Sequence, residues 1–199
     1  MYKKKTPCTF ILIGINIVIF LVLSFFGMTE DAGYMASHGA MYVPYVVENQ
    51  EYYRLVTCMF LHFGIAHLVN NMIVLFGIGG NLEPEIGTVK YIMIYLLSGL
   101  GGNLFSLVYE SRTMDYAVSA GASGAIFGLI GALFYVSIRN NGHLKNVSQR
   151  GILFMIVCSL YLGFTSEGVD NMAHIGGLAT GFLFAAILYR KPVTGYRNW

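Results

Sequence analysis

Charged residues are scarce in this sequence. Asp, Glu, Lys and Arg make up 11% of its 199 residues, whereas hydrophobic residues make up 56%. A soluble domain carries roughly 25% charged residues, so this composition argues against an ordinary water-soluble globule and against a disordered chain. The formal net charge of +2 is also too small to indicate a nucleic-acid-binding protein.

Cysteine is scarce as well, and its positions exclude two more classes of protein. The three cysteines, Cys8, Cys58 and Cys158, lie in or beside apolar runs. Their odd number and wide spacing fit neither a disulfide framework nor a zinc finger. We interpret them as small, buried hydrophobic residues. The 24 glycines follow no Gly-X-Y period, which excludes collagen.

Long uncharged windows are abundant instead. A helix needs about 20 mostly apolar residues to cross a bilayer. Six windows contain no Asp, Glu, Lys or Arg: Thr6–Thr29, Leu55–Leu82, Tyr91–Tyr109, Tyr116–Ile138, Gly151–Ser166 and Asn171–Tyr189. We therefore predict a single all-α membrane domain over residues 1–199, a polytopic bundle whose six transmembrane helices lie at about 9–28, 63–82, 88–109, 121–138, 149–166 and 171–189.

The first apolar run has a second interpretation, because three lysines precede it as in a secretory signal peptide. The run from Phe10 to Met28 is longer than the core of such a peptide, and no Ala-x-Ala cleavage site follows it. We therefore favour a first helix that is retained.

The basic residues predict the orientation of the bundle. If the N-terminus is cytoplasmic, all of them except Arg54 and Arg112 fall on the cytoplasmic side, as the positive-inside rule requires. These residues are Lys3, Lys4, Lys5, Lys90, Arg139, Lys145, Arg150, Arg190, Lys191 and Arg197. Both termini are then cytoplasmic. The longest external connection, about Thr29–Thr57, has the mixed composition of a segment lying in the membrane interface.

Polar residues inside uncharged windows are candidates for function. In this topology His67, Ser123 and His174 each lie about one turn below the external surface. Ser123 stands among small residues at a helix start, where free backbone N–H groups stabilise an oxyanion, and a neutral His174 can accept a serine proton. Both residues also have a structural interpretation. Ser123 can be a helix N-cap, and His174 can be a buried, hydrogen-bonded imidazole.

His67 and Asn71 lie four residues apart and share one helix face. Their side chains can donate to an oxyanion, or they can form hydrogen bonds between helices. His62 lies five residues before His67, which is not the spacing of a chelating pair on a helix. A zinc site of His62, His67 and His174 is therefore not favoured. We predict no metal, nucleotide or other cofactor.

Three motifs in this order resemble those of the rhomboid family. They are His62-x4-His67-x3-Asn71, Gly121-x-Ser123-Gly124 and Ala173-His174-x2-Gly177-x3-Gly181. Three further features are similar to the family pattern: Glu83-x3-Gly87, Tyr53-Arg54 in place of Trp-Arg, and Phe127 in place of a tyrosine that packs on the catalytic histidine.

The resemblance implies an intramembrane serine endopeptidase that cuts single-span transmembrane substrates near the external surface. Ser123 would be the nucleophile and His174 the general base and acid, while His67, Asn71 and the Ser123 N–H would form the oxyanion hole. Tyr53, Arg54, Glu83, Phe127, Gly177 and Gly181 would be structural.

The resemblance is to the compact bacterial form, a multi-pass protein of the plasma membrane with no seventh helix and no soluble extension. The expected partners are transmembrane substrates and membrane lipid, not nucleic acid; the oligomeric state stays open.

Three alternatives remain at this point. Asp170 lies four residues before His174, so it is either a third member of the catalytic set or a helix N-cap. The chain as a whole can also be a rhomboid-like pseudoprotease that binds transmembrane helices without cutting them. A small transporter or channel is disfavoured, because the sequence has no paired membrane carboxylates and no repeated halves.

Overall fold

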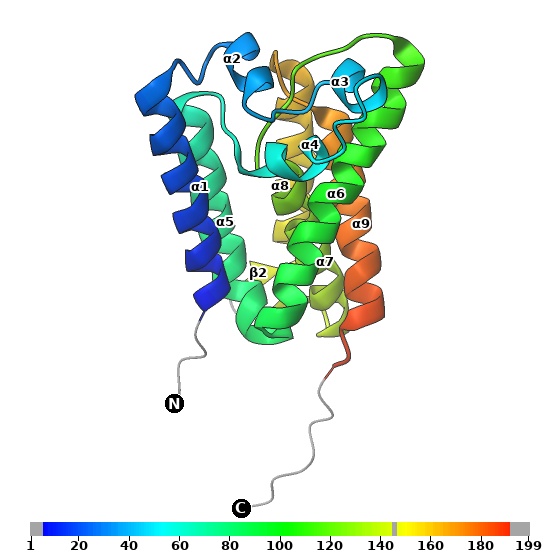
Figure 1. Ribbon diagram of the computed structural model, residues 1–199. Helices are drawn as coiled ribbons and strands as arrows, with labels where there is room; N and C mark the ends of the chain where they lie inside the picture. Colours follow the sequence, from blue (N-terminus) through cyan, green and yellow to red (C-terminus); the bar gives the residue numbers. More distant parts are fainter. Residues whose placement is uncertain (1–5, 145–146, 192–199) are drawn as a thin grey trace, which may run out of the picture.

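The predicted all-α, six-helix architecture is confirmed by the computed structural model in Figure 1, which describes residues 6–144 and 147–191. The long helices are α1 (Pro7–Phe26), α5 (Gly64–Ile86), α6 (Thr88–Thr113), α7 (Ser123–Arg139), α8 (Gln149–Thr165) and α9 (Asn171–Leu188). Of the basic residues used to predict orientation, Lys3, Lys4, Lys5, Lys145 and Arg197 lie outside the described residues.

The two ends of the bundle are built differently. The end at the bottom of Figure 1, where α1 begins and α9 ends, is called the lower end below. It carries β1 (His143–Leu144) and β2 (Val147–Ser148), which pair antiparallel. The opposite, upper end carries the short helices α2 (Ala32–Ser37), α3 (Val43–Val47), α4 (Arg54–Thr57) and η1 (Cys58–Phe60).

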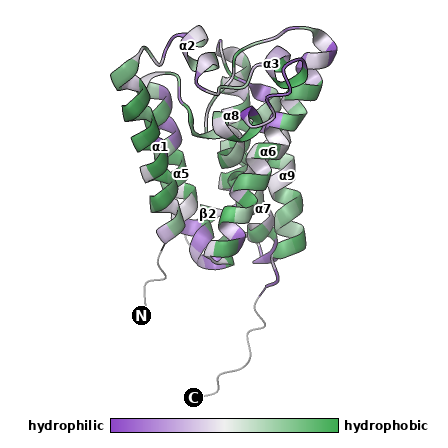
Figure 2. Cartoon of the chain, in the orientation of Figure 1, coloured by the Kyte–Doolittle hydropathy of each residue, from purple (hydrophilic) through white to green (hydrophobic). Residues whose placement is uncertain are grey.

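The middle stretches of the helices consist mostly of hydrophobic residues, and more hydrophilic residues gather toward the two ends of the bundle, as Figure 2 shows. By length and composition, α1, α5, α6 and α9 are suited to cross a membrane. The apolar helices α7 and α8 have 17 residues each. At 1.5 Å per residue each is about 26 Å long, less than the roughly 30 Å of a bilayer core. Most residues of α7 are buried among the other helices, so α7 does not need to span the lipid itself.

Two helices extend past their predicted ends because charged residues are accommodated inside the bundle. Helix α5 continues from the predicted 82 to Ile86, and α6 continues from the predicted 109 to Thr113. Both extensions include a buried carboxylate, Glu83 and Glu110 respectively. Uncharged windows end at such residues and therefore underestimate helix length. Helix α7 begins at Ser123 instead of the predicted 121, because Gly121 has φ +147°, which no helix residue adopts.

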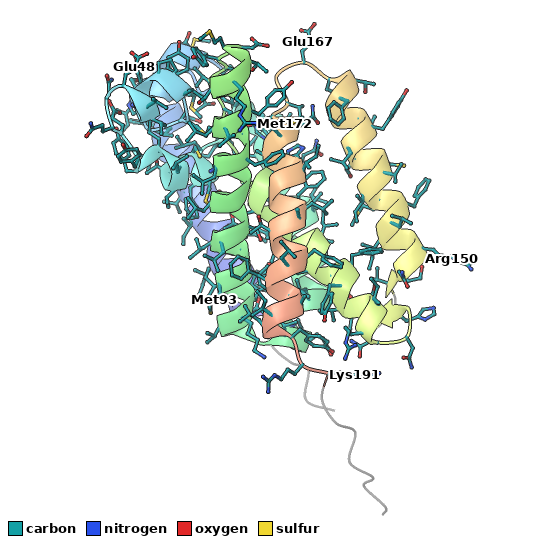
Figure 3. All side chains as sticks on the ribbon, turned by 90° about the vertical axis from the view of Figure 1, so that its right-hand side faces the viewer. Glu48, Met93, Arg150, Glu167, Met172 and Lys191 are labelled. Carbon is teal, nitrogen blue, oxygen red and sulfur yellow. The ribbon has the colours of Figure 1, made fainter. Side chains whose placement is uncertain are left out.

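Helix α8 lies at the edge of the bundle, at the right of Figure 3. Its buried residues are Ile152, Ile156 and Gly163 only. Cys158 on this helix is consequently half-buried, whereas Cys8 and Cys58 are buried as predicted, and all three are free thiols.

Buried hydrogen bonds join the helices at the lower end. The Glu83 carboxylate accepts from the backbone N–H groups of Cys8 and Thr9 at 3.0 and 2.9 Å, and from the Thr9 hydroxyl at 2.7 Å. It thereby caps the free N–H groups at the start of α1 and ties that helix to α5. The Tyr189 hydroxyl donates to Glu85 at 2.8 Å and accepts from Asn140 at 2.8 Å, which links α5, α7 and the end of α9.

The long connection at the upper end is ordered around Arg54. Its guanidinium is buried and donates to the carbonyls of Ala36 and Ala40 at 2.6 and 2.8 Å, and to Glu51 at 2.7 Å. The loop therefore has a fixed shape above the bundle, although it contains little regular structure.

Candidate active site

The side chains of Ser123 and His174 meet inside the bundle, although they lie 51 positions apart in the chain. Ser123 Oγ and His174 Nε2 lie 2.9 Å apart, within hydrogen-bond distance. Ser123 is the first residue of α7, and His174 lies in the first turns of α9. A hydroxyl and an imidazole at this distance can exchange a proton.

Glycines bring α7 and α9 close enough for that contact. A Cβ atom added to Gly177 would collide with the carbonyl oxygen of Gly124, and one added to Gly181 would collide with that of Gly128. A Cβ on Gly131 would likewise collide with the Leu178 carbonyl. The two backbones are therefore in direct contact along a seam of small residues, as expected for close packing in a membrane. With larger residues here, the imidazole would be displaced from the serine.

His67 lies next to Gly121, near Ser123. A Cβ atom on Gly121 would lie 2.9 Å from Cε1 and 3.0 Å from Nε2 of His67, and 3.5 Å from Ser123 Oγ. The His67 ring and the Ser123 hydroxyl thus flank this glycine. The positive φ of Gly121 is a second reason for a glycine here.

Asn71 lies one turn further along α5. It is buried, and its amide Nδ2 has no hydrogen-bond partner among the described residues. An unpaired buried amide is unfavourable, and this arrangement is typical of a site that awaits a ligand acceptor.

These four residues line one cavity of about 570 Å³. Its lining also includes Ala32 of α2, Ser119 in the α6–α7 loop and Glu167 in the α8–α9 loop, so it reaches the upper end. The cavity therefore offers water a route to a serine that lies within a hydrophobic bundle.

A family model described as the Rhomboid domain matches residues 49–191. The chain belongs to the rhomboid family. It is 35% identical over 184 residues to "Rhomboid protease GluP" of Bacillus subtilis (strain 168), covering 92% of this chain and 35% of that protein. It is 41% identical over 155 residues to "RHOMBOID-like protein 5" of Arabidopsis thaliana, covering 77% and 49%.

A third relative is closer in size. The chain is 33% identical over 150 residues to "Putative rhomboid protease YdcA" of Bacillus subtilis (strain 168), covering 75% of this chain and 74% of that protein. The matches to the first two relatives, by contrast, span about a third and about half of their lengths. The predicted resemblance is thus confirmed, and with its apolar helices this rhomboid is a multi-pass membrane protein.

The Phe127 ring is stacked on the imidazole of His174. The two ring centroids are 4.2 Å apart and the planes are 12° from parallel. This contact needs an aromatic face and no hydroxyl, so phenylalanine is sufficient to hold the imidazole in its plane.

Asp170 has the contacts of a helix cap. Its Oδ1 accepts from the backbone N–H of Ala173 at 2.9 Å, and its Oδ2 accepts from the Ser106 hydroxyl at 2.7 Å. His174 Nδ1 has no hydrogen-bond partner among the described residues. Ser123 and His174 therefore form a two-residue arrangement in which Asp170 is not a third member. Asp170 instead holds the start of α9 against α6.

His62 is a site residue whose role was not evident from its spacing. Its ring is buried in the segment before α5, and Nε2 lies 3.5 Å from the Ala122 N–H, which donates to it. Burial lowers the pKa of His62 to about 3, so the ring is neutral and Nε2 is free to accept. His62 thereby supports the turn that presents Ser123. No group of three or more His, Cys, Asp or Glu within residues 6–144 and 147–191 is arranged to hold a metal ion.

Proposed function

We propose that this rhomboid is an intramembrane serine endopeptidase whose reacting groups are Ser123 and His174. The observation that carries the proposal is the 2.9 Å contact between Ser123 Oγ and His174 Nε2 on the wall of a cavity inside an apolar bundle. Relatives of this chain are named as rhomboid proteases, which supports the same reaction.

The reaction begins when Ser123 Oγ attacks the carbonyl carbon of the scissile peptide bond. The hydroxyl proton moves to His174 Nε2, and a tetrahedral oxyanion forms. The C–N bond then breaks, and the imidazolium returns its proton to the leaving amine. A water molecule from the cavity hydrolyses the acyl-enzyme by the same proton transfers, which regenerates the serine.

The oxyanion needs preorganised hydrogen-bond donors. We assign this role to His67, to the unpartnered Asn71 amide and to the backbone N–H of Ser123 at the start of α7. Donors of this kind stabilise the transition state more than the ground state, so they accelerate the chemical step.

The substrates we propose are single-span transmembrane proteins, cut near the external surface. The scissile amide of a transmembrane helix is protected until the helix unwinds locally, which is easiest where Gly, Ser or Pro lowers helix propensity. We place the upper end outside the cell and both termini in the cytoplasm of a bacterium, with the protein in its plasma membrane. The distribution of basic residues supports this orientation.

The test is proteolysis in liposomes that contain the purified protein and a single-span reporter with a helix-breaking outer segment. Wild type, Ser123→Ala and His174→Ala are compared by gel and mass spectrometry, with a chelator in every sample. We expect cleavage by wild type alone, near the outer boundary of the reporter, and at least about a thousandfold less cleavage by each variant. Cleavage that survives Ser123→Ala would disprove the assigned nucleophile.

A fluorophosphonate probe supplies a second measurement that does not depend on the reporter. The wild-type serine is expected to react with the probe, and Ser123→Ala is expected to stay unlabelled. Absence of both labelling and cleavage in wild type would favour the pseudoprotease.

A further inference from the structure

A buried asparagine on α6 is bonded to the segment between α4 and α5. Asn103 is 8% exposed, and its amide Nδ2 donates to the carbonyl oxygen of Leu55 at 2.7 Å and to Cys58 Sγ at 3.0 Å. The Leu55 acceptor fixes which way the amide points, because only the NH2 group can donate to a carbonyl. Both hydrogens of that group are therefore used, and both hold residues that lie far from Asn103 in the chain.

The stretch that Asn103 holds has little regular structure of its own. Leu55 belongs to α4, which has four residues, and Cys58 begins η1, which has three. Such short helices leave most of their carbonyl groups without a partner inside the helix, so a side-chain donor matters more to them than to a long helix. Figure 1 shows α4 against the upper part of α6, and the two helices are in contact. Asn103 thus ties a short, weak stretch to a long helix.

The turn that leads to Ser123 rests on the same stretch. The Gly121 N–H donates to the Cys58 carbonyl at 2.9 Å, and the Ala122 N–H donates to His62 Nε2 at 3.5 Å. Both acceptors lie between the end of α4 and the start of α5. Cys58 is therefore held through its sulfur by α6 and through its carbonyl by the turn, so a shift of Cys58 is transmitted to Ser123.

This turn determines the geometry of the reacting groups. Ser123 is the first residue of α7, so the turn before it sets where its Oγ and its backbone N–H lie. His174 is held independently of this turn, by its own helix α9 and by the stacked Phe127 ring. A displacement of about 1 Å between reacting groups can lower a rate about a hundredfold.

We propose that Asn103 is a positioning residue of the active site, which fixes Cys58 to α6 and thereby holds the Gly121 turn and Ser123 in the reactive geometry. This inference rests on the proposed function and adds a residue that acts through others. A polar residue that only joins helices is the alternative. The two roles differ in one respect, because only a positioning residue alters the reactivity of the serine in protein that is still folded.

The two bonds of Asn103 differ in strength. Sulfur is a weak acceptor, and burial raises the pKa of the Cys58 thiol to about 12, so the sulfur carries no negative charge that would strengthen the bond. The Leu55 carbonyl is the stronger acceptor. Loss of the Cys58 sulfur should therefore disturb the turn less than loss of the Asn103 amide.

The experiment measures the rate at which the fluorophosphonate probe labels Ser123 in the full-length protein, together with kcat and KM for the reporter in liposomes. Asn103→Leu is similar in shape and has no donor, and we expect it to lower the labelling rate and kcat about tenfold, with KM within about twofold of wild type. Asn16→Leu is the matched control, because it makes the same change at a buried asparagine whose Nδ2 donates to Leu12 within α1. It should keep both rates within about twofold of wild type.

A second variant keeps the test decisive if Asn103→Leu does not fold. Cys58→Ala retains the bond from Asn103 to Leu55 and is expected to lower the labelling rate about threefold. All rates are divided by the folded fraction, which unfolding in detergent provides. Labelling of Cys58→Ala at the wild-type rate would then overturn the inference.

The outcomes separate this inference from the proposed function. If wild type cuts the reporter and Asn103→Leu is as reactive as Asn16→Leu, the inference is overturned and the protease stands. A rise in KM alone would also overturn it, because Asn103 lines the cavity and would then bind the substrate directly. If wild type neither cuts the reporter nor reacts with the probe, the proposed function itself fails and the inference falls with it.

Discussion

Two groups of buried polar residues lie at opposite ends of this bundle, and they differ in whether they line the cavity. At the lower end, Glu83 accepts from Cys8, Thr9 and Thr88, and Tyr189 both donates and accepts. In the cavity near the upper end, Asn71 Nδ2 and His174 Nδ1 have no partner among the described residues.

The difference separates polar residues that hold helices together from polar residues that await a substrate. A polar group in a membrane is unfavourable unless it is hydrogen-bonded, so a saturated group stabilises the fold. An unsatisfied group reduces stability. On the wall of the cavity, as at Asn71, it is placed to bind a ligand, whereas the Tyr91 and Tyr95 hydroxyls, which also have no partner among the described residues, do not line the cavity. The lower end should therefore govern stability and the cavity should govern activity, and the four predictions below test that division.

The largest effect is expected at Asn71. Asn71→Ala removes an oxyanion donor and should lower kcat by about a hundredfold. The free energy of unfolding should not decrease, because the amide that is lost has no partner to leave behind. Reporter cleavage and unfolding in detergent measure the two quantities. A loss of stability equal to the loss of activity would contradict the proposed role.

Glu83→Ala should have the opposite effect to Asn71→Ala: it should reduce stability and leave activity unchanged. Without the carboxylate, the N–H groups of Cys8 and Thr9 lose their acceptor, and the free energy of unfolding should decrease by about 3 kcal/mol. The activity of the fraction that remains folded should be unchanged. Glu48→Ala, at an exposed position, serves as the control and should change neither quantity.

Substitutions at Phe127 test whether its ring holds the His174 imidazole in place. Phe127→Ala removes the ring stacked on His174, so kcat should fall by about tenfold. Phe127→Tyr keeps the aromatic face and should stay within about twofold of wild type. If Phe127→Tyr were as inactive as Phe127→Ala, stacking alone would not explain this position.

The smallest effect is expected at Tyr189. Tyr189→Phe removes the hydroxyl that joins Glu85 to Asn140, and the free energy of unfolding should decrease by about 1 kcal/mol. The rate of reporter cleavage should not change, because this contact lies at the end of the bundle remote from Ser123. A change in kcat would show that the two ends are coupled.

Much of the site was evident in the sequence because its residues belong to short motifs. The positions of Ser123, His67 and His174 in uncharged windows indicated that they lie at one depth. The spacing of Gly177 and Gly181 indicated close helix packing, and both glycines contact α7. The roles of these residues in catalysis remain predictions for the experiments above.

Other features could not be predicted from local sequence patterns, because they depend on contacts between distant segments. The extension of α5 past residue 82 depends on Glu83 meeting the start of α1, 74 residues away in the chain. The role of Asp170 depends on Ser106, which is 64 residues away. Neither partner can be inferred from the sequence near the carboxylate itself.

Composition and spacing were sufficient for the membrane class and the number of long helices, because hydropathy and helix periodicity are local properties. The motif residues were identified through the resemblance to the rhomboid family. The tertiary structure was needed for the 2.9 Å approach of Ser123 to His174 and for the stacking of Phe127 on His174. These features arise where α6, α7 and α9 pack together. Packing sums many weak contacts along whole helices, and no single segment contains that information.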